Sequence, residues 1–145
     1  MLYQIKMIGE RKLQMKKIIN ADLAGKILLS AFGLLLVLHI LIIVQIVPAD
    51  FVWGGQIKAD GSNLMQLEIV AITLTLFFAG IVAAKIKSLQ ANKSNKLITI
   101  GMWVVFAYLV LNTLGNFASG VRAETWFLGP LTIVMALCAF RLGIE

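Results

Sequence analysis

Four long apolar runs interrupt this chain, and each is long enough to cross the hydrocarbon core of a membrane as a helix. The first, from Ile27 to Val47, carries no formal charge; at about 1.5 Å per residue, a run of this length covers the roughly 30 Å of hydrocarbon. Backbone groups in lipid must be satisfied within a helix or a closed barrel, and continuous rather than alternating hydrophobicity excludes a barrel. We predict transmembrane helices over residues 27–47, 67–86, 97–117 and 126–142.

The composition agrees with a membrane protein: 60% of the 145 residues are hydrophobic, 14% are charged and the mean hydropathy is +0.93. A soluble domain needs a more polar shell, and a chain of this length is expected to form one domain. The predicted fold class is all-α, a polytopic membrane four-helix bundle over residues 1–145. The first run and the Val-Pro-Ala after it imitate a secretory signal, but a signal has only about 7 to 15 apolar residues, so we expect a permanent helix.

Basic residues gather on one side of the predicted membrane. Of the 13 Lys and Arg residues, all but Lys58 and Arg122 lie before the first helix, between the second and third helices or at the end of the fourth. Because Lys and Arg are retained on the cytoplasmic side, both termini are predicted to be cytoplasmic, in a cell membrane such as the bacterial inner membrane. The loops after the first and third helices then face outward.

Residues 1–26 form a basic N-terminal segment in which Leu and Ile are interspersed with Lys and Arg. This pattern is typical of an amphipathic helix on anionic headgroups, so membrane lipids are the expected partner. The segment either anchors the topology or senses lipid. The net charge of +6 lies along this boundary without a nucleic-acid-binding motif, and we expect no nucleic-acid partner.

Single cysteine and histidine residues limit the chemistry of the chain. Cys138 is the only cysteine, which excludes a CxxC redox pair. His39 is the only histidine, and the sequence has neither an HExxH motif nor a Cys/His cluster, so we expect no metal site and no cofactor.

The fourth predicted helix carries small residues at spacings of three and four, which place them on one face. A neighbouring backbone can approach closely along such a face, either within the bundle or in a homodimer. Pro130 should bend this helix or loosen its first turns, because its ring blocks the carbonyl group of Trp126. The small residues are Gly129, Thr132, Ala136, Ala139 and Gly143.

Polar side chains at membrane depth are the candidate functional residues, because such groups are costly in lipid and face the bundle interior. His39 lies just past the middle of the first helix, either as a hydrogen-bonded structural residue or in a ligand or proton role. Tyr108, Asn112 and Asn116 repeat every four residues along one face of the third helix. The amides either join helices or hold a polar ligand.

Glu68, near the outer end of the second helix, has two interpretations. Its carboxyl group either lies at headgroup level near the N-terminus of its helix, or it pairs inside the bundle with Arg122 or a cationic ligand. Asp50 and Glu124 flank the first and fourth helices, and we expect both to be solvated rim residues.

The stretch PADFVWGGQI follows the first helix. Pro48 is predicted to end that helix where lipid ends, and Trp53 suits an interface that is half apolar and half wet. Gly54 and Gly55 permit a turn that other residues resist. In the predicted topology this loop lies over the outer mouth of the bundle, so Trp53 is also a candidate lid.

Three segments, VWGG (52–55), NTLGN (112–116) and GPLT (129–132), resemble a group of small, poorly characterised four-helix bacterial integral membrane proteins. The resemblance covers residues 27–143 and implies four spans without an established activity. A looser similarity is to the four-helix fold of sterol isomerases and sigma-2-type receptors. That similarity implies a pocket inside the bundle where His39 and Glu68 shuttle a proton.

The candidate ligand-binding residues share one location, the outer half of the bundle: His39, Glu68, Tyr108, Asn112, Asn116 and, above them, Trp53. We predict a polar-lined pocket that opens outward and binds an apolar or amphipathic small molecule or a lipid. A buried polar network without a void is the structural alternative.

Other functions remain open at this point. A membrane-embedded isomerase-type enzyme would use His39 with Glu68, although the sequence favours a non-enzyme. An accessory or assembly subunit would need no ligand. A small-solute transporter would need a polar route through the cytoplasmic half, which the sequence lacks.

Overall fold

The computed structural model describes residues 20–55 and 63–145. Four long helices follow one another in these residues: α2 (Ala21–Ile43), α3 (Leu64–Gln90), α4 (Lys96–Ala118) and α5 (Gly129–Gly143), with a π-helical turn, η3 (Glu124–Leu128), leading into α5. With η3 counted into α5, all four are long and apolar enough to cross a membrane, so the described chain is an all-α, four-span membrane protein. Residues 1–19 of the predicted amphipathic segment lie outside the described residues.

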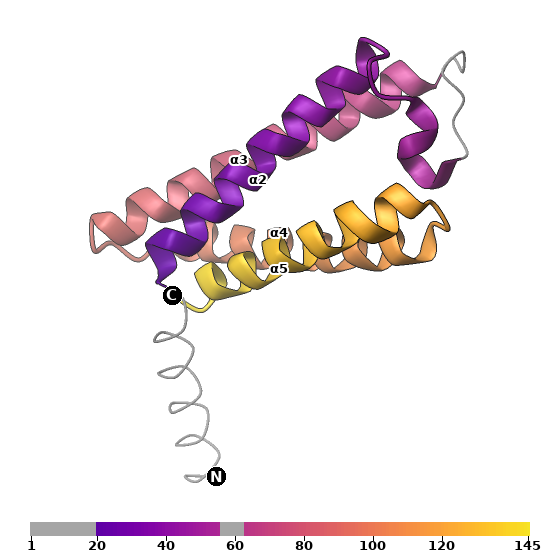
Figure 1. Cartoon of the computed structure of the whole chain (residues 1–145). Coiled ribbons are helices and arrows are strands. Elements are labelled where there is room, and N and C mark those ends of the chain that lie inside the picture. The colour runs from indigo at the N-terminus through magenta and orange to yellow at the C-terminus, as the bar shows by residue number, and fades with distance from the viewer. Residues whose placement is uncertain (1–19, 56–62) are drawn as a thin grey trace, which may run out of the picture.

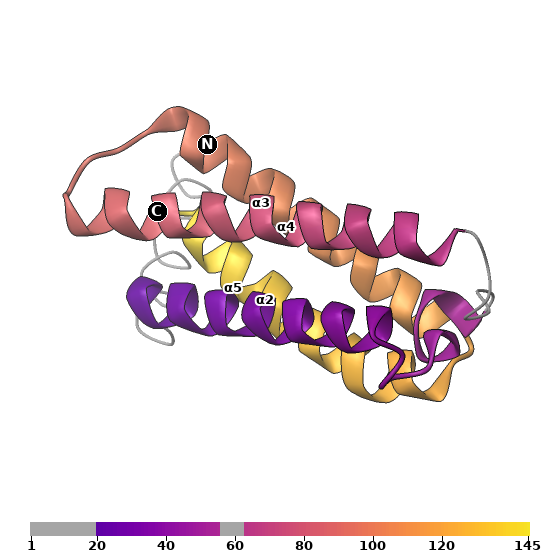
Figure 2. The ribbon, with the colours of Figure 1, turned by 90° about the horizontal axis from the view of Figure 1, so that it is seen from above.

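The helices form two antiparallel hairpins, α2 with α3 and α4 with α5 (Figure 1). The hairpins lie close together at the end that holds the start of α2 and the C-terminus, and they diverge toward the other end. Seen from above, α4 and α5 run obliquely beneath α2 and α3 (Figure 2). We call the two ends the narrow end and the wide end; the loops after α2 and after α4 are both at the wide end.

An apolar core fills the narrow half. The small residues of α5 are buried along the length of that helix, as predicted, and they allow close packing with α4: a Cβ atom on Gly129 would lie 2.9 Å from the ring of Phe117, and one on Gly143 would lie 3.3 Å from the ring of Trp103. The largest fully buried apolar side chains of this core are Leu28, Phe32, Met102, Leu109, Met135 and Leu142.

The narrow end also buries two basic side chains that we expected at the membrane boundary. Lys85 is 4% exposed and donates a hydrogen bond to Thr99 Oγ1 (3.0 Å), and Arg141 is 5% exposed and bonds Glu145 Oε1 (2.8 Å). Lys85 lies inside α3, which continues to Gln90 beyond the predicted helix end at residue 86, and its side chain reaches α4 instead of a loop.

Helix α2 both begins and ends earlier than the predicted range 27–47. Pro48 does not end it: Gln45 takes a left-handed conformation (φ 59°), and the N–H groups of Gln45 and Ile46 donate to the carbonyls of Ile42 and Leu41. These two bonds form a Schellman motif, which satisfies the free carbonyls of the last turn. Pro48 instead precedes η1 (Ala49–Phe51), the first of two short helical turns in the loop; the second is η2 (Trp53–Gly55).

Pro130 loosens the start of the fourth span, as predicted. The turn before it is π-helical, and the N–H group of Gly129 bonds the carbonyl of Glu124, five residues back. This wider turn accommodates a proline ring that would otherwise clash with a carbonyl of the preceding turn. The span therefore starts at Glu124, not at Pro130, and keeps its membrane-crossing length.

Candidate functional site

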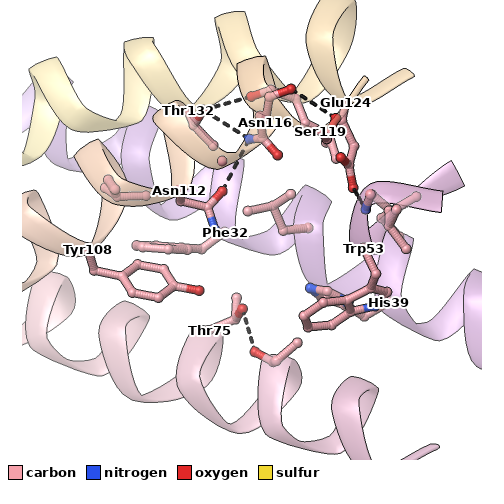
Figure 3. Close-up of a pocket in the computed structure, with 18 of the residues that line it drawn as sticks. Phe32, His39, Trp53, Thr75, Tyr108, Asn112, Asn116, Ser119, Glu124 and Thr132 are labelled. Atoms are coloured by element: carbon pink, nitrogen blue, oxygen red, sulfur yellow. Dashed lines mark hydrogen bonds between the residues drawn. The ribbon is translucent and has the colours of Figure 1, made fainter. Parts of the chain in front are cut away.

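A cavity of about 420 Å³ lies between the two hairpins in the wide half of the bundle (Figure 3). Its walls are mostly apolar and come from all four helices and the loop after α2. Phe32, Phe78 and Leu109 line it and are also members of the buried core, so they form its floor toward the narrow end. The cavity is therefore a pocket above a packed core.

Glu68 organises the wall nearest the loop. Its side chain is fully buried, Nδ1 of His39 lies 2.6 Å from Oε2, and the indole N–H of Trp53 donates to Oε1 over 2.7 Å. These contacts join α2, the loop and α3 through one carboxyl group. Glu68 itself does not line the cavity; His39 and Trp53 do.

The second ring nitrogen of His39 is free to meet a ligand. Nδ1 is held by Glu68, and no residue in 20–55 or 63–145 bonds Nε2. Because no fully buried side-chain nitrogen or oxygen in those ranges lacks a partner, Nε2 must be accessible, and His39 lines the cavity. A histidine backed by a carboxyl group in this way can donate or accept a proton at Nε2.

The loop after α2 is tied down at its glycine turn. Trp53, Gly54 and Gly55 all have left-handed φ angles (58°, 66° and 67°), and the N–H group of Gly54 donates to Oε1 of Glu124 over 3.0 Å. Glu124 is only 5% exposed, so our expectation of a solvated rim residue was wrong for Glu124, whereas Asp50 is exposed as expected. A carboxyl group is buried there because it accepts an otherwise unpaired backbone N–H.

A chain of hydrogen bonds forms the opposite wall. Asn116 Nδ2 donates to Oδ1 of Asn112 (3.2 Å) and to Oγ1 of Thr132 (3.3 Å), and the Thr132 hydroxyl in turn bonds the Leu128 and Gly129 carbonyls. The hydroxyl of Tyr108 points into the cavity (Figure 3) and, within the described ranges, has no hydrogen-bond partner. Asn116 thus joins α4 to α5, while Tyr108 presents its hydroxyl to a ligand.

Five of the six predicted site residues line this cavity: His39, Trp53, Tyr108, Asn112 and Asn116. The sixth, Glu68, stands behind the wall. Its proposed pairing with Arg122 is wrong, because both carboxyl oxygens bond other residues, and Arg122 lies in a separate surface hollow beside Trp126.

The predicted site residues did not include four polar residues of the lining: Thr75, Ser119, Glu124 and Thr132. The signal for Thr132 was present, since it is the polar member of the small-residue face of α5. Within residues 20–55 and 63–145, no three His, Cys, Asp or Glu side chains gather as metal ligands.

Comparisons with protein-family models, curated proteins and solved structures found no match.

Replacing Glu68 by alanine should destabilise the wide half, because it removes the acceptor of the Trp53 indole and the partner of His39. We expect the free energy of unfolding in detergent to fall by about 3 kcal/mol. In a Trp103→Phe, Trp126→Phe background, the emission of Trp53 should also become more accessible to acrylamide.

Asp50→Ala is the matched control, since Asp50 is an exposed acid on the same loop. Glu68→Gln keeps an acceptor for the indole and should retain part of the stability. A Glu68→Ala protein as stable as Asp50→Ala, with unchanged Trp53 quenching, would contradict the role given to this carboxyl group.

Proposed function

We propose that this protein binds an apolar or amphipathic small molecule or lipid in the cavity of its wide half, and that the wide end faces outward. The observation that carries the proposal is the cavity itself, about 420 Å³ in volume and lined mainly by apolar side chains with a few converging polar groups. Small-molecule sites have this size and character.

The placement of the polar groups favours an amphipathic ligand. His39 and Trp53 stand on one side of the cavity and Tyr108 and Asn112 on the other (Figure 3), and the rings of Phe32 and Phe78 also line it. A ligand with one hydrogen-bonding group and a hydrocarbon body can bond the polar groups and also cover the apolar walls. A strongly hydrated solute would leave the apolar walls in contact with water.

Binding is favoured over transport and over a ligand-free accessory role. The cavity floor of Phe32, Phe78 and Leu109 continues into a packed apolar core, so the described helices provide no polar route to the narrow end. An accessory subunit without a ligand predicts a filled interior, which the cavity does not fit.

A second function, an isomerase-type enzyme, is favoured by one contact, the 2.6 Å hydrogen bond between His39 and Glu68. Moving a double bond needs a proton delivered to one alkene carbon and a proton removed from a neighbouring carbon. Nε2 of His39 could do both in turn, so that the histidine is regenerated and the product is an isomer of the substrate.

Filling the cavity should abolish binding. Native mass spectrometry of the purified protein is expected to show a retained molecule, which Leu35→Trp removes because residue 35 lines the cavity. Leu34→Trp is the control, since Leu34 is 60% exposed on the outside of the same helix. Asn112→Leu should weaken binding by about 1 kcal/mol, roughly fivefold in Kd. Equal retention by both tryptophan variants would contradict the proposal.

The isomerase function predicts hydrogen exchange with the solvent. The retained molecule, incubated with the protein in deuterated water, should gain deuterium and yield an isomer, as detected by mass spectrometry and chromatography. His39→Gln should bind the molecule but stop the deuterium uptake. Uptake by the native protein no faster than by His39→Gln would leave binding as the function.

The outward orientation of the wide end is tested with single cysteines. In a Cys138→Ser background, Arg122→Cys should react with a membrane-impermeant maleimide on intact cells, because the positive-inside rule places the wide end outside. Lys93→Cys, on the exposed loop at the narrow end, should react only after lysis. The reverse pattern would overturn the orientation.

A further inference from the structure

The cavity has one exposed edge, and that edge lies on α4. Of the residues that line the cavity, those in the loop and on the other helices are buried or half-buried, whereas Gly115 and Ala118 are exposed. The two are separated by three positions, so they lie on the same face of the helix, about one turn apart. Both lie in the last turn of α4, a helix long and apolar enough to cross a membrane, and we infer that this exposed edge faces the lipid.

The two helices beside this edge separate as they approach the wide end. In the narrow half α3 and α4 are joined by the Lys85–Thr99 hydrogen bond, and a Cβ atom on Gly101 would lie 3.1 Å from Ile81. Farther along, the rings of Phe78 and Tyr108 still meet with centroids 4.8 Å apart.

Beyond that ring contact the two hairpins continue to diverge toward the wide end (Figure 1). A Cβ atom on Gly115 would meet nothing within 4 Å. Of the neighbouring helix pairs, α3 and α4 also make the least contact. The cavity lining includes small residues on both helices: Ala71 on α3, and Gly115 and Ala118 on α4.

Building on the proposed function, we propose that the gap between α3 and α4 at Gly115 and Ala118, the α3/α4 opening, is a lateral passage that admits the ligand from the bilayer. The ligand class is then a membrane lipid. Its hydrogen-bonding head lies between His39 and Asn112, and its hydrocarbon tail extends through the opening into the surrounding lipid.

The cavity volume and the tethered loop after α2 support this assignment. At about 420 Å³ the cavity is near the lower end of the range for small-molecule sites, so it encloses only part of a long-chain lipid. On the side of the loop the cavity is lined by Trp53 and Gly54, which are held by Glu68 and Glu124. A tail that leaves between α3 and α4, past Gly115 and Ala118, keeps its CH₂ groups in the bilayer and out of water.

Trp53 makes the passage measurable, because its indole lines the cavity. The protein with Trp103→Phe and Trp126→Phe, which leaves Trp53 as its only tryptophan, is reconstituted into vesicles of phosphatidylcholine brominated on its acyl chain. Bromine quenches tryptophan only near contact. We expect strong quenching relative to vesicles of unbrominated phosphatidylcholine.

Gly115→Phe should block the opening and reduce this quenching several-fold, and Ala118→Phe is a second variant for the same purpose. Gly80→Phe is the matched control, since Gly80 is an exposed helical glycine on α3 that lies outside the cavity lining and whose Cβ would also meet nothing within 4 Å. Circular dichroism and gel filtration select the variants that fold.

Absence of quenching in the parent protein, or equal quenching in the Gly115→Phe and Gly80→Phe proteins, would overturn the lateral passage. Either result leaves the proposed function standing if native mass spectrometry still finds a molecule that Leu35→Trp displaces. Quenching that Gly115→Phe removes, in a protein that retains no molecule, would instead support the passage and overturn the binding function.

Discussion

The carboxyl group of Glu68 is the interaction on which the wide half of the bundle depends. It is fully buried, and it holds His39 of α2 through one oxygen and the Trp53 indole through the other. Burying a carboxyl group without hydrogen-bond partners costs a large free energy, so the burial of Glu68 requires these two partners. The loop is thereby tied to the first hairpin, and the two helices of that hairpin are joined through one carboxyl group.

The position that this bond gives the loop strains the loop's backbone. Trp53 has a left-handed φ of 58°, which costs a residue with a Cβ atom about 1 kcal/mol or more, whereas Gly54 and Gly55 take similar angles freely. The bond to Glu68 and the bond from Gly54 to Glu124 offset that strain. The wide half is held by these polar contacts and by a small apolar cluster of Ile42, Ala49, Val52 and Leu64, whereas the larger apolar core fills the narrow half. This difference between the two halves is what leaves a cavity.

Periodicity predicted the parts of this arrangement that are local. The four spans, the small-residue face of α5 and the inward face of Asn112 and Asn116 all follow from helical spacing. Contacts between distant segments did not follow: Glu124 is buried because a backbone N–H in another loop needs an acceptor, and nothing near it in sequence says so. The end of α2 was missed for a different reason, since Gln45 occupies a left-handed position that usually holds glycine. The contact between His39 and Glu68 was expected only as a condition of the enzyme hypothesis.

The polar residues at membrane depth divide into two kinds, and the division bears on whether the cavity is more than a packing defect. The side-chain amide of Asn116 donates to Asn112 and Thr132, as expected of a group that joins helices. His39 and Tyr108 differ, because each keeps a polar atom that no described residue bonds and that faces the same space. A network selected for structure alone would be expected to turn these atoms toward one another or toward backbone carbonyls, since polar groups left without partners in lipid are costly. The two unpaired atoms that face a shared void therefore favour the proposed ligand over a packing defect.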